Sequence, residues 1–132
     1  MSRHRIVVAM GAACLSVSCF TGPSAHSFTP AVTGHGVDGQ LQLRNRAVKG
    51  ELLELRDTAY VLATGEGILL VPFTAVRRAK FESFGSFGGG VPDSEWRERL
   101  HLASRFPHGI PESALRTLLE EARQSELLVV RQ

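Results

Sequence analysis

The sequence predicts an α+β protein, in which a small five-stranded antiparallel β-barrel is followed by two helices and a C-terminal strand. The first observation is a series of short apolar runs between residues 39 and 81, separated by Gly, Asp and Pro. Such runs are typical of a β-meander, and a meander that curls into a barrel buries its apolar face and protects its edges. The second observation is a helical spacing of apolar residues after residue 93. A chain of 132 residues has room for one such domain.

The first 27 residues predict a signal peptide for export. A basic start is followed by an apolar run at residues 6–17 and then by small residues, the order that export machinery reads. The apolar run is too short to cross a bilayer as an ordinary helix. A buried N-terminal helix is the plain alternative. Residues 28–36 then predict a flexible tether.

The leader has two candidate cleavage sites. Ala25 and Ser27 occupy the −3 and −1 positions of an ordinary cleavage site before residue 28. Residues 15–19 instead resemble the lipobox of bacterial lipoproteins, which implies cleavage before Cys19 and lipidation of its thiol. Cys14 and Cys19 are the only cysteines, so the domain that follows is expected to have no disulfide and no cysteine metal site.

The barrel is expected at residues 37–83. Five strands are predicted, at residues 39–43, 50–56, 59–64, 68–71 and 76–81. The first alternates apolar and polar residues, as a half-buried strand does. Gly65 and Gly67 suit a tight hairpin because glycine tolerates a positive φ. Pro72 forbids a ladder hydrogen bond where it stands, and the next three residues have the length of one helical turn.

Three segments of this region resemble the Sm-like and SH3-like small barrels: residues 50–55 (GELLEL), 60–62 (YVL) and 71–76 (VPFTAV). In those families a bent strand after a glycine leads through two hairpins to a single helical turn before the last strand. The resemblance implies the barrel. The strand order is similar to the bacterial Sm-like RNA chaperone, whose RNA pocket uses Tyr-Lys-His where this chain has Pro-Phe-Thr at 72–74. The layout also resembles exported bacterial proteins with a barrel followed by helices, which implies no activity.

Residues 84–93 predict a glycine-rich linker, which lacks the Lys-Ser/Thr ending of a phosphate-binding P-loop. Residues 94–132 predict a helical region that packs on the barrel. Ser94 is expected to cap its first helix. A second helix is expected at residues 111–124, and residues 127–130 (LLVV) predict a strand at an open barrel edge.

Three aromatic residues are candidate contacts for a ligand or partner: Trp96, Phe84 and Phe87. Trp96, the only tryptophan, has a helical spacing with Leu100 and Ala103 that favours a core anchor, with ligand stacking as the alternative.

A basic cluster lies on the last predicted barrel strand, and its members are Arg77, Arg78 and Lys80. We interpret it as a solvated strand face, with an anion-binding patch as the alternative. Without the two arginines of the leader, 13 Lys+Arg balance 13 Asp+Glu (15 − 2 against 13), which disfavours a nucleic-acid binder.

No residue combination predicts catalysis, a metal site or a cofactor. His101 and His108 are separated by a Pro-Gly break and have no third ligand nearby. Glu51, Glu54 and Asp57 are expected at exposed strand and turn positions, which does not suit acid–base chemistry.

We therefore expect an exported envelope protein, free in the periplasm or anchored by lipid, whose domain is a non-catalytic structural or protein-interaction module. Its partner is expected to be an envelope protein or peptide. The alternative is a secreted domain that binds a small ligand or a peptide at the barrel mouth or at an open strand edge. Sm-like RNA binding is the third hypothesis.

Overall fold

The computed structural model describes residues 34–131. The predicted leader, Cys19 and most of the predicted tether lie outside these residues. The elements are β1 (Asp38–Gln42), β2 (Ala47–Leu55), β3 (Ala59–Thr64), β4 (Gly67–Pro72), a 3₁₀ turn (Phe73–Ala75), β5 (Arg78–Phe81), β6 (Gly85–Gly88), α2 (Ser94–Ala103), α3 (Glu112–Glu121) and β7 (Leu128–Val129). The α+β class, the helical turn after β4 and the C-terminal strand are confirmed.

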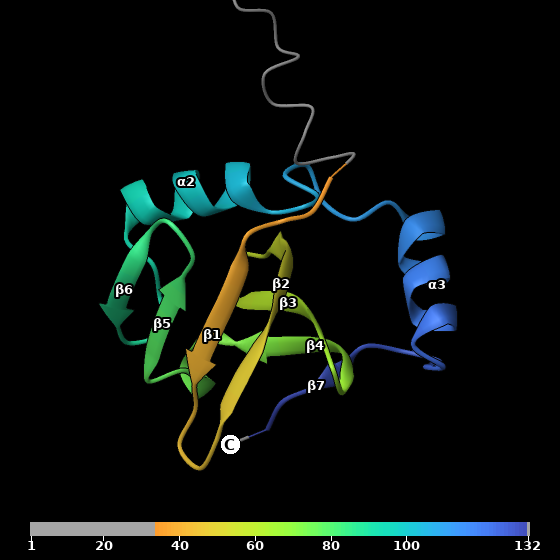
Figure 1. Cartoon of the computed structure of the whole chain (residues 1–132), viewed down its shortest axis with the longest axis horizontal. Coiled ribbons are helices and arrows are strands. Elements are labelled where there is room, and N and C mark those ends of the chain that lie inside the picture. Colours follow the sequence, from red (N-terminus) through yellow and green to blue (C-terminus); the bar gives the residue numbers. More distant parts are fainter. Residues whose placement is uncertain (1–33, 132) are drawn as a thin grey trace, which may run out of the picture.

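Seven strands form one sheet in the order β6-β5-β1-β2-β3-β4-β7 (Figure 1). Neighbouring strands are antiparallel except β4 and β7, which are parallel. The five predicted strands form the continuous middle of this order, but the prediction of a closed five-stranded barrel was wrong. The edges of β4 and β5 that would close it pair instead with β7 and β6.

The stretch expected to be a glycine-rich linker contains a strand. β6 continues from β5 through a tight turn, and Phe81 is paired with Gly85. Ser83 and Gly85 in and after this turn have positive φ angles of 66° and 86°. Glycine adopts such angles without steric cost, so the composition that suggested a linker serves a hairpin here.

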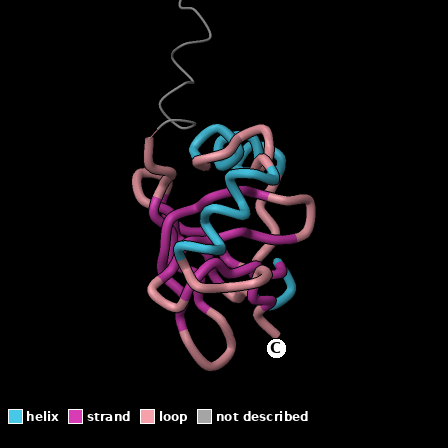
Figure 2. The backbone as a smooth tube through the Cα atoms, turned by 90° about the vertical axis from the view of Figure 1, so that its right-hand side faces the viewer, coloured by secondary structure: helices cyan, strands magenta, loops and turns pink. Residues whose placement is uncertain are grey.

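The middle of the sheet is buried on both faces. The pairing register of β2 and β3 shifts between Leu52 and Glu54, so the adjacent Leu52 and Leu53 are both buried and lie in different clusters. Leu52 belongs to the main core, whereas Leu53 packs with Val61 and Ile68 beneath α3 and the segment before it. Figure 2 shows α3 crossing in front of these strands. This double burial explains the continuous apolar runs of β3 and β4.

Both predicted helices are present with small differences at their ends. α2 is capped by Asp93, whose side chain accepts a hydrogen bond from Trp96 N at 2.9 Å, so the prediction of Ser94 as the cap was wrong by one residue. Ser94 is the first helical residue instead. α3 begins directly after Pro111 and ends three residues before the predicted 124. Within the described residues, neither helix has the length and apolar character that a membrane crossing requires.

The C-terminal segment covers the outer edge of β4. In β7, Leu128 and Val129 are paired with Leu69 and Leu70 of β4, beyond which Val130 N donates to the Leu70 carbonyl at 2.9 Å. The side chain of Gln124 covers the next part of the same edge.

The amide of Gln124 binds the backbone of Ile68 at both of its polar groups. Ile68 N donates to Gln124 Oε1 at 2.7 Å, and Gln124 Nε2 donates to the Ile68 carbonyl at 3.1 Å. The side chain therefore occupies the place of a strand residue at one step of the ladder. The preceding Arg123 has a φ of 57°, a left-handed conformation that turns the chain out of α3.

Candidate functional site

The free edge of β6 is the first component of the candidate site. Just after β6, Gly89 N donates to the carbonyl of Arg77, the residue before β5, at 2.6 Å. Peptide groups alternate in direction along an antiparallel strand, so those of Phe87 face β5 and those of Ser86 and Gly88 face away from it. In the described sheet no strand lies beyond β6. Such unpaired peptide groups are a template for an additional strand.

The three candidate aromatic residues are brought together beside this edge. The ring of Trp96 lies 5.3 Å from that of Phe87 and 6.0 Å from that of Phe84. All three are half-buried and pack against the main core. Arg99 covers Phe84 and Trp96 at 5.1 and 5.5 Å from the ring centres. The aromatic cluster therefore anchors α2 on the sheet and also leaves aromatic surface exposed.

The uncovered outer face of β1, β2, β5 and β6 is the second component. Directly paired residues point to the same face. The pairing therefore places a row of polar side chains across four strands: Ser86, Lys80, Gln40 and Lys49. Beside it lies a second, shorter row: Gly88, Arg78 and Gln42. All of these residues are exposed. We call the two rows the basic face.

An open hollow of about 790 Å³ lies on the basic face, and its lining contains no carboxylate; it is formed by Gln40, Gln42, Arg77, Arg78, Lys80 and Ser86. Within residues 34–131, the ion pairs involve none of its three cations. Asp38 and Glu82 line the adjoining hollow, at the end of the face where β5 turns into β6. The face is therefore basic at one end and mixed at the other.

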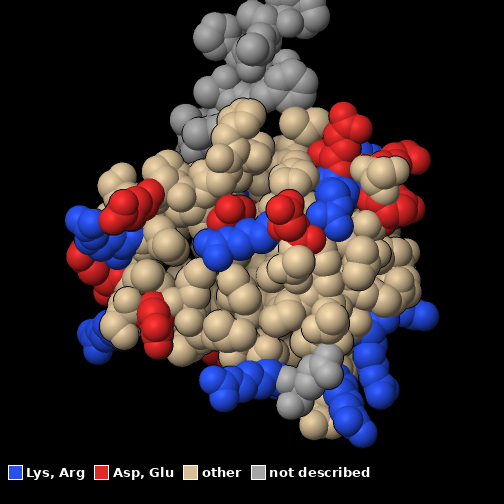
Figure 3. Space-filling view, turned by 180° about the vertical axis from the view of Figure 1, so that it is seen from behind, with Lys and Arg blue, Asp and Glu red and all other residues tan. Residues whose placement is uncertain are grey.

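The opposite side of the molecule differs in its charge pattern. Figure 3 shows acidic and basic side chains interspersed over the upper part of that side and mainly basic side chains along its lower rim. Ion pairs neutralise several of the cations away from the basic face, as between Arg46 and Glu66 at 2.6 Å and between Arg56 and Glu54 at 3.2 Å.

The sequence by itself indicated part of this site. It identified the aromatic residues and Arg77, Arg78 and Lys80, but it did not place the two groups on adjacent parts of one edge. It missed the polar residues of β1 and β2, namely Gln40, Gln42 and Lys49. Their alternation with buried neighbours was a usable signal, because it marks one solvent-facing side of a strand.

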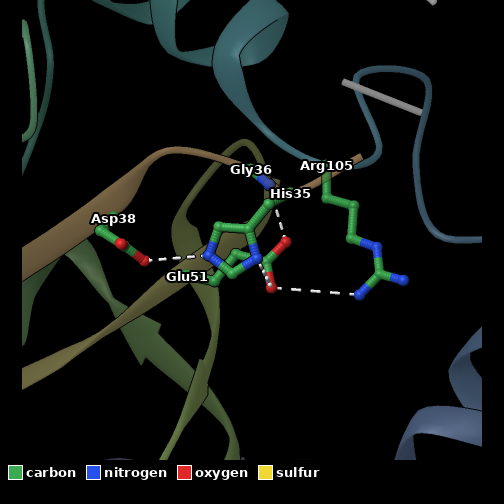
Figure 4. A network of polar contacts seen from close by, with 5 residues as sticks. All are labelled: His35, Gly36, Asp38, Glu51 and Arg105. Carbon is green, nitrogen blue, oxygen red and sulfur yellow. Dashed lines mark hydrogen bonds and ion pairs between the residues drawn. The ribbon is translucent and has the colours of Figure 1, made fainter. Parts of the chain in front are cut away.

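A buried carboxylate holds the chain where it enters β1 (Figure 4). Glu51 is 7% exposed, so its expected exposed position was wrong. It accepts a hydrogen bond from Gly36 N at 2.7 Å and lies 3.2 Å from His35 Nδ1, while Arg105 is 3.9 Å away. His35 Nε2 also contacts Asp38 at 3.2 Å. These contacts fix the last residues of the predicted tether against β2 and the segment after α2, which is a structural role.

The single tyrosine holds the segment that follows β6. Tyr60 is fully buried between Phe73 and Phe81, and its hydroxyl donates to the Gly90 carbonyl at 2.7 Å. Burial raises the pKa of Tyr60, and the nearby Arg97 guanidinium offsets only part of that effect. The hydroxyl therefore serves as a neutral hydrogen-bond donor.

The closed barrel whose mouth was expected as a ligand site is not formed, but a pocket of about 390 Å³ lies beside the covered β4 edge. Leu43, Leu69 and Ala75 contribute apolar surface, and three arginines, Arg44, Arg46 and Arg131, line it as well. Residues of the C-terminal strand region also line this pocket, so the segment that covers the β4 edge forms part of its wall.

Among residues 34–131, no group of three or more His, Cys, Asp or Glu side chains is placed to hold a metal ion. A scan against protein-family models and searches of curated proteins and of solved structures found no match to this chain.

Proposed function

We propose that this chain is an exported, non-catalytic interaction module of the cell envelope that binds an extended segment of a partner protein as an added strand on β6. One observation carries the proposal. The described sheet has two outer edges: the chain covers the β4 edge with its own C-terminal residues, whereas no described strand pairs with the β6 edge, which lies beside a half-buried aromatic cluster. Main-chain hydrogen bonds along a free edge supply affinity, and neighbouring side chains supply selectivity.

The short length of β6 is compatible with this role. Edge strands of four residues are also a common protection against aggregation, because they offer few peptide groups to a partner. Here the edge is accompanied by half-buried rings of Trp96 and Phe87, which a docked strand would cover. A segment bound by few backbone hydrogen bonds needs such apolar contact, and this site offers it.

The peptide test follows the fluorescence of Trp96 during titration with alternating peptides of about eight residues, an ordinary strand length. The panel contains Gln-Val, Glu-Val and Lys-Val repeats. The parent protein is expected to bind at least one of them with a change in emission. Ser86→Pro removes an outward N–H and is expected to abolish binding, whereas Ser86→Ala keeps the N–H and is expected to bind normally.

The strand-addition proposal is wrong if no peptide of the panel binds the folded parent, or if Ser86→Pro binds as tightly as Ser86→Ala. Circular dichroism of both variants checks that each is folded before the comparison is made.

The location rests on the leader, residues 1–27, and on Cys19. We propose export, with lipid attachment at Cys19 and free release near residue 28 as the two forms to be separated. Intact mass of the protein from separated membrane and soluble fractions distinguishes them. A diacylglycerol increment on a chain beginning at Cys19 makes it a lipoprotein, and an unmodified chain beginning near residue 28 makes it a free protein. A full-length, unprocessed chain contradicts export.

A further inference from the structure

The partner's chemistry can be inferred from the side chains around the free edge, and this inference rests on the proposed function. We propose that the segment bound at β6 is acidic, with Asp or Glu at alternate positions and apolar residues between them. The acidic side chains lie over the basic face, and the apolar side chains lie toward Phe87 and Trp96.

The side chains of an added strand would point alternately to the two faces of the sheet. Residues of the added strand opposite Ser86 and Gly88 point to the same face as those two residues, which is the basic face. The residues between them point to the face of Phe87, where Ala79 and Phe81 are buried. Two different environments therefore alternate along the bound segment, one cationic and one apolar.

The cations of β5 are long enough to reach an added strand across β6. The added strand lies two strand spacings from β5, about 10 Å. The intervening positions carry a short side chain at Ser86 and none at Gly88, so nothing stands between the added strand and β5. Lys80 and Arg78 are the β5 partners of those two residues, and their long side chains can extend over β6 toward a carboxylate.

The charge of the basic face favours an acidic segment as well. Arg77, Arg78 and Lys80 line a hollow without a carboxylate and take part in none of the ion pairs within residues 34–131. An incoming carboxylate therefore meets cations that need not leave an internal partner. Glu82 and Asp38 lie at the other end of the face, in an adjoining hollow that Lys80 and Lys49 also line. Of the two positions that face the basic side chains, an acidic residue is therefore favoured more beside Gly88 than beside Ser86.

The experiment uses the full chain and the three peptides of the panel at low ionic strength. The Glu-Val peptide is expected to bind about tenfold more tightly than the Gln-Val peptide, and the Lys-Val peptide is expected to bind most weakly. The double variant Arg78→Gln/Lys80→Gln is expected to bind Glu-Val and Gln-Val equally, with the affinity for Gln-Val unchanged.

A charge-matched control separates the local effect from the net charge of the protein. Arg116→Gln/Arg123→Gln removes two exposed cations on and after α3, which covers β2, β3 and β4 rather than the basic face. This variant is expected to keep the tenfold preference for Glu-Val. Added salt is expected to reduce the preference in the parent, because exposed charges are screened.

The outcomes separate the two proposals. Equal binding of Glu-Val and Gln-Val by the parent overturns the acidic preference and leaves strand addition standing. Binding of no peptide overturns both. Binding of a single-stranded oligonucleotide or of anionic vesicles that needs Arg78 and Lys80 but tolerates Ser86→Pro identifies another polyanion as the occupant, and it overturns this inference as well.

Discussion

The two edges of the sheet are treated in opposite ways. At the β4 edge, Gln124 binds the backbone N–H and carbonyl of Ile68, and the chain beyond β7 reaches the Leu70 carbonyl through Val130 N. At the β6 edge, the described residues add no strand. Covering an edge and keeping its strand short both limit edge-to-edge pairing, and this sheet has the first at β4 and the second at β6. Strand addition, as proposed above, would take place at the edge that the described residues do not cover.

The two edges also differ in how they are built. β6 joins the sheet through a local hairpin with β5, whereas Gln124 reaches Ile68 across 56 residues of sequence. The covered edge depends on the packing of α3 against the sheet, because Gln124 follows that helix. The free edge needs only the hairpin and the aromatic cluster. Mutations at the covered edge should therefore lower the free energy of unfolding more than mutations at the free edge.

The largest effect is expected from a chain that ends after Gln124. It loses the β7 ladder, the bond from Val130 N to Leu70 and the packing of Leu127 and Val130. At about 1 kcal/mol for each bond and each half-buried side chain, the free energy of unfolding should fall by about 3 kcal/mol or more. Urea unfolding followed by Trp96 fluorescence measures it. Sedimentation should also detect self-association through the exposed β4 edge, and an unchanged stability contradicts the role of this segment.

The next effect is expected from Gln124→Ala. It removes both bonds to the Ile68 backbone and leaves a partly buried N–H and carbonyl unpaired, at a cost of about 1–3 kcal/mol. Gln124→Glu is the matched control, since its carboxylate can accept from Ile68 N but cannot donate to the carbonyl. Its stability should lie between those of the parent and Gln124→Ala, and a control as unstable as the alanine variant argues against paired recognition.

A smaller effect is expected at the base of the free edge. Tyr60→Phe removes the hydrogen bond to the Gly90 carbonyl and should cost about 1 kcal/mol at neutral pH. Burial raises the folded-state pKa of Tyr60 above its ordinary value of 10.0, so the unfolded state loses its proton first as pH rises. The stability that this group contributes is therefore complete below pH 10.0 and is lost above it.

Ultraviolet absorbance checks the pH dependence, since Tyr60 is the only tyrosine. Tyrosinate should form together with unfolding in the parent. Stability curves of Tyr60→Phe should decline less steeply above pH 10.0. Free ionisation of Tyr60 in the folded protein near its ordinary value would contradict the raised pKa.

The smallest effect is expected from Ser86→Lys. Ser86 is exposed and its side chain has no hydrogen-bond partner within residues 34–131, so the free energy of unfolding should change by less than about 0.5 kcal/mol. The substitution places a fourth cation on the basic face and should strengthen binding of the Glu-Val peptide. Thermal unfolding and the same fluorescence titration measure both quantities. A large loss of stability would mean that the β6 edge is an internal contact rather than a free surface.

Local sequence patterns predicted much of the fold. Alternating and continuous apolar runs, with Gly65, Gly67 and Pro72 between them, predicted five strands and the 3₁₀ turn at nearly their observed positions. Helical spacing predicted both helices, and the β-prone LLVV predicted β7. These features depend on residues a few positions apart, where periodicity and turn chemistry are informative.

The errors share a different origin. Glu51 reads as an exposed strand residue, because the chain gives no sign that Gly36 and Arg105 lie beside it. The glycines of β6 read as a linker, because only pairing with β5 makes that stretch a strand. The cap fell on Asp93 rather than Ser94, since either side chain suits the position and backbone geometry chooses.

By itself, the sequence determined the class of fold, the order of its elements except β6, and the chemistry of the side chains that surround that strand. Tertiary structure alone decided which edge of the sheet is covered, which charges share a face and which aromatic rings meet. The reason is physical. Periodicity is set by the geometry of one strand or helix, whereas pairing across tens of residues depends on which apolar surfaces and unpaired peptide groups remain to be covered once the neighbouring elements have packed.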